Sequence, residues 1–261
     1  MTALALWLLL VAGLDLVRSR LRFRVRSVVV AAAAGAVLSL LIAVAVSPGG
    51  TGWAAWIIAT VGIAGWVLGS GVATARFGRV PTLGVPAGIT PARAAIGAYA
   101  SLVAGLLALL LAGSAAGSAS FLSAALARSG LGHLPAEQVL LVAAALLLQI
   151  STANLIVRLL LDLVGVPASD NEKTLRGGRV LGPMERLLIL GLGLGVGGSL
   201  TGAAIVVAAK SLLRFPELRV PRAGDPGYGG ASDITEYFLV GSFASWLVAL
   251  TSVALIALSA G

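Results

Sequence analysis

The sequence predicts an all-α protein, a polytopic bundle of about seven membrane-spanning helices. Hydrophobic residues make up 59% of the 261 residues and charged residues only 11%, and the mean hydropathy is +1.04. This is more apolar surface than a water-soluble chain of this length can bury. Seven apolar runs are long enough to cross a hydrocarbon core of roughly 30 Å, which takes about 20 helical residues. The runs lack the strict alternation of barrel strands, so helices are the expected way to pair the backbone in lipid.

The first apolar run, Thr2 to Val17, is followed by arginine at every second position from Arg18 to Arg26. A cleavable signal peptide carries its basic residues before the apolar stretch, so this order predicts a retained span. Basic residues favour the cytoplasmic side, which puts the N-terminus outside. A nucleic-acid-binding arm is the alternative for this arginine run, but its position beside a span favours the membrane surface, and we expect no nucleic-acid partner.

The second and third runs, Val28 to Val46 and Trp53 to Ala73, are joined by a Pro/Gly turn at 47–52 that has no Lys or Arg. The absence of basic residues predicts an external turn, and the two tryptophans at the start of the third run are typical of an interfacial aromatic belt. The loop from Arg76 to Arg93 is basic and contains three prolines. We therefore expect it to be irregular and cytoplasmic.

The fourth run covers Ala95 to Ala112, and the apolar piece after it, Phe121 to Ala127, is too short to span. That piece is expected to be re-entrant or interfacial. The fifth run, Ala136 to Val164, is long enough to tilt or to project beyond the bilayer. The polar stretch Pro167 to Gly182 carries basic residues, which predict a cytoplasmic position.

The sixth run, Met184 to Phe215, has two interpretations. A single crossing leaves Lys210 and Arg214 outside, against the positive-inside bias. A break at the glycines of 191–198 with a re-entrant return keeps these residues inside. We expect the single crossing, because such glycines also serve as close-packing surfaces between helices. With a last span from Ile234 to Ser259, the chain is predicted to form one membrane domain, with N-terminal spans in residues 1–130 and a polar cluster in residues 131–261.

Polar residues recur along the fifth run. Ser151, Asn154, Arg158 and Asp162 follow one another at spacings of three and four, so they share one helix face. A charge at membrane depth is costly unless it is paired or hydrated, so this face is expected to meet the bundle interior, a cavity or the interface. It forms either a polar pocket or ion path, or an Arg158–Asp162 pair that reaches from the helix end to the head groups.

The sixth and last runs carry further ionisable residues. Glu185 and Arg186 open the sixth run, where Glu185 complements the positive end of the helix dipole. Lys210 and Arg214 lie one turn apart near its end, an arrangement that either holds a phosphate head group or anchors the helix end. Glu236 belongs to an acidic capping box, or it is a buried counter-charge to these basic residues.

Three C-terminal blocks, in order, resemble an uncharacterised family of bacterial multi-spanning inner-membrane proteins whose blocks read ERLLI, AAKSxxRF and EYxLxGxxxS. The resemblance covers roughly Ala136 to Ser245. The family also has a histidine and aspartate pattern in its first span, where this chain has only Asp15, so the resemblance leaves the N-terminal half in doubt. It implies no reaction. It does imply that one polar cluster contains Glu185, Arg186, Lys210, Arg214 and Glu236.

Several catalytic classes are disfavoured. The chain has no cysteine, which excludes disulfides and thiolate chemistry, and its one histidine cannot supply paired haem ligands. Its ten acidic residues are scattered singly, unlike the aspartate clusters that hold magnesium in lipid-processing enzymes. We therefore expect no cofactor and no metal, and an enzyme acting on a lipid is the least favoured function.

The function that the sequence favours is binding or transport of an anionic lipid or small solute through the C-terminal polar residues. The expected binding residues are Asn154, Arg158, Asp162, Glu185, Arg186, Lys210, Arg214 and Glu236. The alternative is a non-catalytic scaffold or accessory subunit whose small-residue faces pack against partner helices. The expected partners are anionic membrane lipids, with a homo-oligomer or a membrane partner protein, in a bacterial cytoplasmic membrane.

Overall fold

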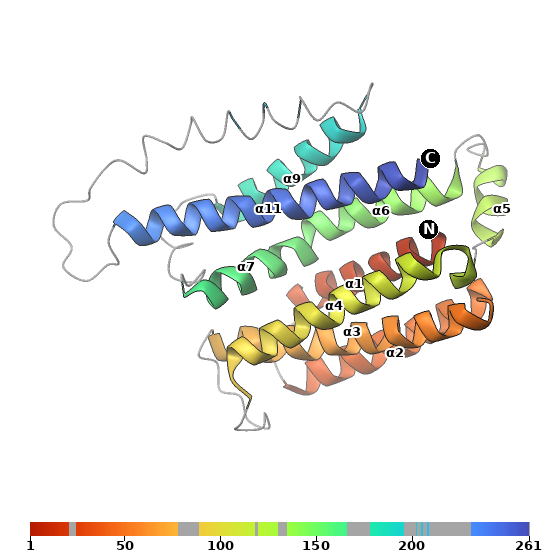
Figure 1. The fold of residues 1–261 in the computed structure, drawn as a ribbon, viewed down its shortest axis with the longest axis horizontal. Helices are drawn as coiled ribbons and strands as arrows, with labels where there is room; N and C mark the ends of the chain where they lie inside the picture. The colour runs from red at the N-terminus through yellow and green to blue at the C-terminus, as the bar shows by residue number, and fades with distance from the viewer. Residues whose placement is uncertain are drawn as a thin grey trace. The chain divides into compact units, whose positions relative to one another are not determined.

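The computed structural model describes residues 1–20, 25–77, 89–117, 120–129, 135–165, 178–195, 202, 205, 208 and 231–260. Within these ranges every regular element is a helix (Figure 1), which confirms the all-α prediction. Among the described residues, five helices are long and apolar enough to cross a membrane, and the interrupted pair α6 (Ala136–Ile150) and α7 (Thr152–Val164) makes a sixth span if it is counted as one. The chain is an integral membrane protein of the helical type.

The first of two compact units contains residues Met1–Thr152 and Leu255–Gly261. Its helices lie where the apolar runs predict them, within a few residues at each end, as is usual for helix boundaries. In chain order it contains α1 (Thr2–Arg20), α2 (Val25–Val46), α3 (Gly50–Phe77), α4 (Pro91–Ala112), the 3-10 turn η1 (Gly113–Ala116), α5 (Ser120–Arg128) and α6.

Helices α3 and α4 pack at a distance that only glycine permits. A Cβ atom on Gly62 would lie 2.7 Å from the carbonyl oxygen of Ser101, and a Cβ atom on Gly69 would lie 2.8 Å from the carbonyl oxygen of Ala94. Lipid tails are as apolar as the helices, so close backbone contact is a main source of association energy in a bilayer. The small-residue face of α3 therefore packs against α4 of the same chain.

Two tryptophans of this unit donate hydrogen bonds to backbone carbonyls of other elements. The indole Nε1 of Trp7 donates to the carbonyl of Ala59, and that of Trp56 donates to the carbonyl of Ala116, both at 2.9 Å. Of the two tryptophans expected in an interfacial belt, Trp53 is 39% exposed, whereas Trp56 is buried. Trp56 is thus held by packing and by a carbonyl of η1, which needs a donor because the turn ends there.

The fifth apolar run is interrupted at Ser151, between α6 and α7. The Ser151 hydroxyl lies 2.9 Å from the carbonyl oxygens of both Leu147, one turn earlier, and Ala12 of α1. A serine hydroxyl that bonds back to the preceding turn competes with the helix ladder and bends or ends the helix. The break therefore falls at a serine that contacts both its own preceding turn and a carbonyl of α1.

The second unit contains residues Ala153–Ala254, with α7 from Ala153 onward, α9 (Gly178–Leu194) and most of α11 (Ala231–Ala260). Helix α9 begins before the expected Met184, so Pro183 lies inside the helix. Ile189 and Ala249 are buried together, with Trp246 packed against them. Most of the sixth run beyond residue 195 lies outside the described residues, so the choice between a single crossing and a re-entrant return stays a prediction.

Candidate functional site

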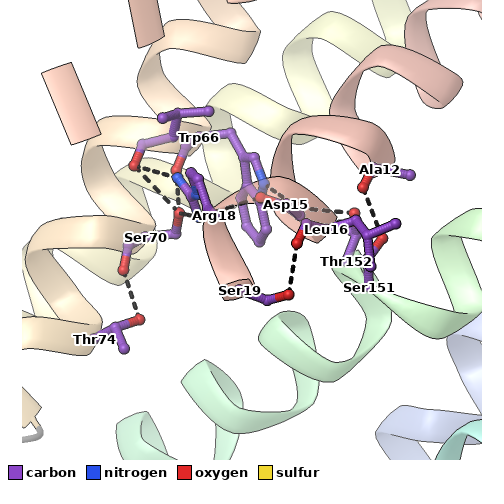
Figure 2. Close-up of polar contacts among 11 residues, drawn as sticks. Ala12, Asp15, Leu16, Arg18, Ser19, Trp66, Ser70, Thr74, Ser151 and Thr152 are labelled. Atoms are coloured by element: carbon purple, nitrogen blue, oxygen red, sulfur yellow. Dashed lines mark hydrogen bonds and ion pairs between the residues drawn. The ribbon is translucent and has the colours of Figure 1, made fainter. Parts of the chain in front are cut away.

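The first unit contains a group of polar side chains that we call the Asp15 cluster: Asp15, Arg18, Trp66, Ser70 and Thr152 (Figure 2). Asp15 and Arg18 lie one turn apart on α1, Trp66 and Ser70 lie one turn apart on α3, and Thr152 is the first residue of α7. The i,i+3 and i,i+4 spacings put each pair on a single helix face. Three parts of the chain that are distant in the sequence therefore meet at one carboxylate.

The side chain of Asp15 is only 2% exposed, and its two oxygens meet different partners. Its Oδ2 accepts hydrogen bonds from Trp66 Nε1 at 2.9 Å and from Thr152 Oγ1 at 2.8 Å. Its Oδ1 lies 3.2 Å from Nη2 of Arg18. A buried carboxylate is tolerated only with such donors and an opposite charge, because desolvation alone would cost several kcal/mol.

Arg18 extends the cluster along α3. Its Nη1 donates to the carbonyl oxygen of Val67 at 2.7 Å, and its Nη2 donates to Ser70 Oγ at 3.0 Å. Figure 2 shows the guanidinium between the carboxylate of Asp15 and this carbonyl–hydroxyl pair. The Asp15–Arg18 pair carries no net charge and joins α1 to α3, which is the arrangement of an internal anchor.

The second unit contains a separate group that we call the Arg186 cluster: Asn154, Glu185, Arg186, Ser245 and Trp246. Arg186 is only 2% exposed. Its Nη1 donates to Ser245 Oγ at 3.0 Å, and its Nη2 donates to Asn154 Oδ1. Both of these acceptors are neutral oxygens, and together they fix the orientation of the guanidinium.

Glu185 is the acidic member of the Arg186 cluster. It is 4% exposed, and its Oε1 accepts a hydrogen bond of 2.7 Å from Trp246 Nε1. Its charge also acts on Arg186, the next residue along α9. Two consecutive residues of α9 thus contact two consecutive residues of α11. Glu185 accepts a hydrogen bond from Trp246, and Arg186 donates one to Ser245.

Only some of the residues predicted as a binding site are brought together by described contacts. Asn154, Glu185 and Arg186 belong to the Arg186 cluster. Arg158 and Asp162 lie about one and two turns after Asn154 on α7, and both are half-buried. The remaining predictions fall wholly or partly outside the described residues: Lys210 and Arg214 lie outside them, and Glu236 lies in α11 without a described side chain.

The sequence analysis did not identify the Asp15 cluster. The available signal was an acid three residues before an arginine in an otherwise uncharged run, which a helix places on one face. Nothing marks Trp66 or Thr152 as its partners, because both come from distant segments. Ser245 is the final serine of the third C-terminal block, but the block does not reveal that it receives Arg186.

In the parts of the chain that the structure describes, no group of three or more His, Asp or Glu side chains is arranged to hold a metal ion. Comparison of the chain with models of protein families, with curated proteins and with solved structures gives no match.

Proposed function

We propose that this integral membrane protein binds an anionic group, from a lipid head group or a small solute, at the Arg186 cluster. One observation carries the proposal: the guanidinium of Arg186 is buried within the second unit and is oriented by hydrogen bonds to the oxygens of Asn154 and Ser245. Glu185, the residue before Arg186, accepts a hydrogen bond from the indole of Trp246 and helps to fix the same cluster.

The cost of burying Arg186 supports a role beyond packing. An ionised side chain inside a membrane protein costs several kcal/mol, and an apolar residue of similar size would fill the same space more cheaply. The planar guanidinium carries five donors in a fork that matches the oxygens of a carboxylate or a phosphate. A ligand oxyanion beside this fork would be held by charge-assisted hydrogen bonds, which are stronger than bonds between neutral groups.

The proposal extends to the other predicted residues on sequence grounds. Lys210 and Arg214, one turn apart, would add positive charge for a phosphate, with Arg158, Asp162 and Glu236 as flanking groups. We further propose that the protein lies in a bacterial cytoplasmic membrane with its N-terminus outside. The resemblance of its C-terminal blocks to the bacterial family is part of the same proposal.

The test is the affinity of purified protein for phosphatidylglycerol, measured by native mass spectrometry, beside thermal stabilisation by inorganic phosphate. Arg186→Gln should weaken binding about tenfold or more, since a hydrogen bond to a charged group contributes about 1.5–3 kcal/mol. Arg26→Gln is the matched control, because Arg26 is exposed at the start of α2. A loss confined to the lipid, or to free phosphate, identifies the source of the anionic group.

Two further variants keep the test decisive if Arg186→Gln does not fold. Asn154→Ala and Ser245→Ala retain the arginine but loosen its orientation, so each should weaken binding by a smaller factor. Lys210→Gln with Arg214→Gln examines the extended site. Equal lipid and phosphate binding by wild type and all these variants would contradict the proposal, and a stoichiometric partner protein retained by each would favour the scaffold alternative.

A further inference from the structure

Helices α3 and α4 of the first unit form an open groove of about 390 Å³, and no residue of the Asp15 cluster lines it. Ile57, Ile58 and Val61 line it from α3, and the small residues Ala100 and Ala104 line it from α4. The small side chains of α4 leave a hollow along the outer edge of the α3–α4 contact, and Ile57 and Val61 are 56% and 65% exposed there. The groove therefore opens toward whatever surrounds the helices.

The groove offers almost no hydrogen bonding to an occupant. Ser101 has the only hydroxyl among the lining side chains, and this hydroxyl donates to the carbonyl oxygen of Gly97 on its own helix at 2.7 Å. A head group, sugar or nucleotide would lose its water there without compensation, which costs about 1–3 kcal/mol for each unpaired polar group. The occupant is therefore apolar.

The depth of the groove indicates which apolar occupant it takes. The apolar windows of the two helices are Gly50–Ala75 and Pro91–Ala116, and the groove residues Gly62 and Ala104 lie near their centres. The medium at the middle of a span is hydrocarbon chain, not head group. The lining on α3 covers residues 57–62, roughly 8 Å of a helix that is about 40 Å long, whereas a partner helix would contact several turns.

We propose that this groove is a binding site for one acyl chain of a membrane lipid, reached by the middle or the end of the chain. The site is independent of the anion proposed for the Arg186 cluster, because it lies in the first unit and contains no charged side chain.

The experiment uses the full chain in lipid nanodiscs that contain phosphatidylcholine with a photoactivatable diazirine on one acyl chain. With the diazirine at mid-chain, cross-linking mapped by mass spectrometry should be at least fivefold higher at Ile57, Val61 and Ala104 than at Val37 and Leu41. The last two are 57% and 59% exposed on α2 and report ordinary lipid contact. With the diazirine beside the glycerol, this enrichment should disappear.

A filled groove provides the second arm. Ala100→Leu with Ala104→Leu should lower mid-chain cross-linking at Ile57 and Val61 at least fivefold, whereas Val103→Leu, an exposed position on α4 outside the lining, should leave it unchanged. Arg186→Gln should label as wild type does. Equal labelling of the groove and α2 would overturn the proposal, and so would cross-links between two copies of the chain at Ala104. Both outcomes are read from the wild type, so they do not depend on whether the filled variant folds.

Discussion

The indole of Trp66 on α3 donates a hydrogen bond of 2.9 Å to the carboxylate of Asp15 on α1, across 51 residues of sequence. The same oxygen accepts a second bond from Thr152, and the other faces Arg18. A buried carboxylate held by two donors and an opposite charge favours one register of a helix bundle, because another packing would separate these groups from one another. Substitutions in the Asp15 cluster are therefore expected to lower the stability of the fold rather than to change the binding of a ligand.

Removal of the carboxylate tests this anchor. Asp15→Ala leaves the Arg18 guanidinium without its acid and leaves the Trp66 and Thr152 donors without an acceptor. We expect a loss of about 3 kcal/mol in the free energy of unfolding. The measurement is unfolding by sodium dodecyl sulfate in mixed micelles, followed by circular dichroism.

The double variant Asp15→Ala with Arg18→Ala shows whether the two residues act as a pair. Its loss should fall short of the summed single losses by about 0.5–3 kcal/mol, because the lone charge is removed as well. Additive losses would mean that Arg18 is held by Val67 and Ser70 alone, and the ion pair would then have no part in the anchor.

The hydroxyl of Thr152 isolates one hydrogen bond of the cluster. Thr152→Val keeps the shape and removes the donor to Asp15, and interhelical hydrogen bonds of this kind average about 0.6 kcal/mol, with a maximum near 1.7. We expect a loss within that range in the same unfolding assay. Thr51→Val is the matched control, because Thr51 is exposed in the first turn of α3. Equal losses of unfolding free energy in the two variants would show that the hydrogen bond from Thr152 to Asp15 contributes nothing to stability.

The helical class and most span positions could be predicted because they depend on local properties of the sequence. A run such as Val28 to Val46 is apolar throughout, and an apolar run of sufficient length is enough to form a helix in lipid. The break at Ser151 was not predicted, since a serine hydroxyl that bonds back to the preceding turn, as that of Ser151 does to Leu147, does not by itself end a helix. The same residue type inside another helix, Ser101, makes such a bond to Gly97 without ending α4.

The polar clusters were less predictable because they are made by pairs that tertiary packing selects. Helix spacing assigns Ser151 and Asn154 to one stripe, yet Ser151 bonds to Ala12 and Asn154 bonds to Arg186. Helix periodicity defines which residues share a face, but it does not define which helix covers each turn of that face. Glu185 and Arg186 were found because ionisable residues in an apolar run are rare enough to be conspicuous.

The glycines of α3 provide a stability test outside the polar clusters. A methyl group on Gly69 would meet the carbonyl oxygen of Ala94 at 2.8 Å and the Cβ of Ala98 at 3.0 Å, so α3 and α4 must separate. We expect Gly69→Ala to cost about 1–3 kcal/mol. Gly97→Ala on α4 is the control, since nothing lies within 4 Å of its added Cβ. There the substitution should be neutral or slightly stabilising, as alanine favours a helix. A neutral Gly69→Ala would mean that the two helices do not pack through this face.

The orientation in the membrane can be tested cleanly because the chain has no cysteine. The positive-inside bias predicts that the turn before α3 is external and that the basic loop before α4 is cytoplasmic. Thr51→Cys and Ile89→Cys place one thiol near each of these segments, at exposed positions next to helix ends. In intact cells a membrane-impermeant maleimide should label the first variant, and it should label the second only after lysis. The reverse pattern would put the N-terminus inside, and the arginines from Arg18 to Arg26 would then have crossed the membrane against their charge. Labelling of both variants in intact cells would instead contradict the assignment of α3 as a single span.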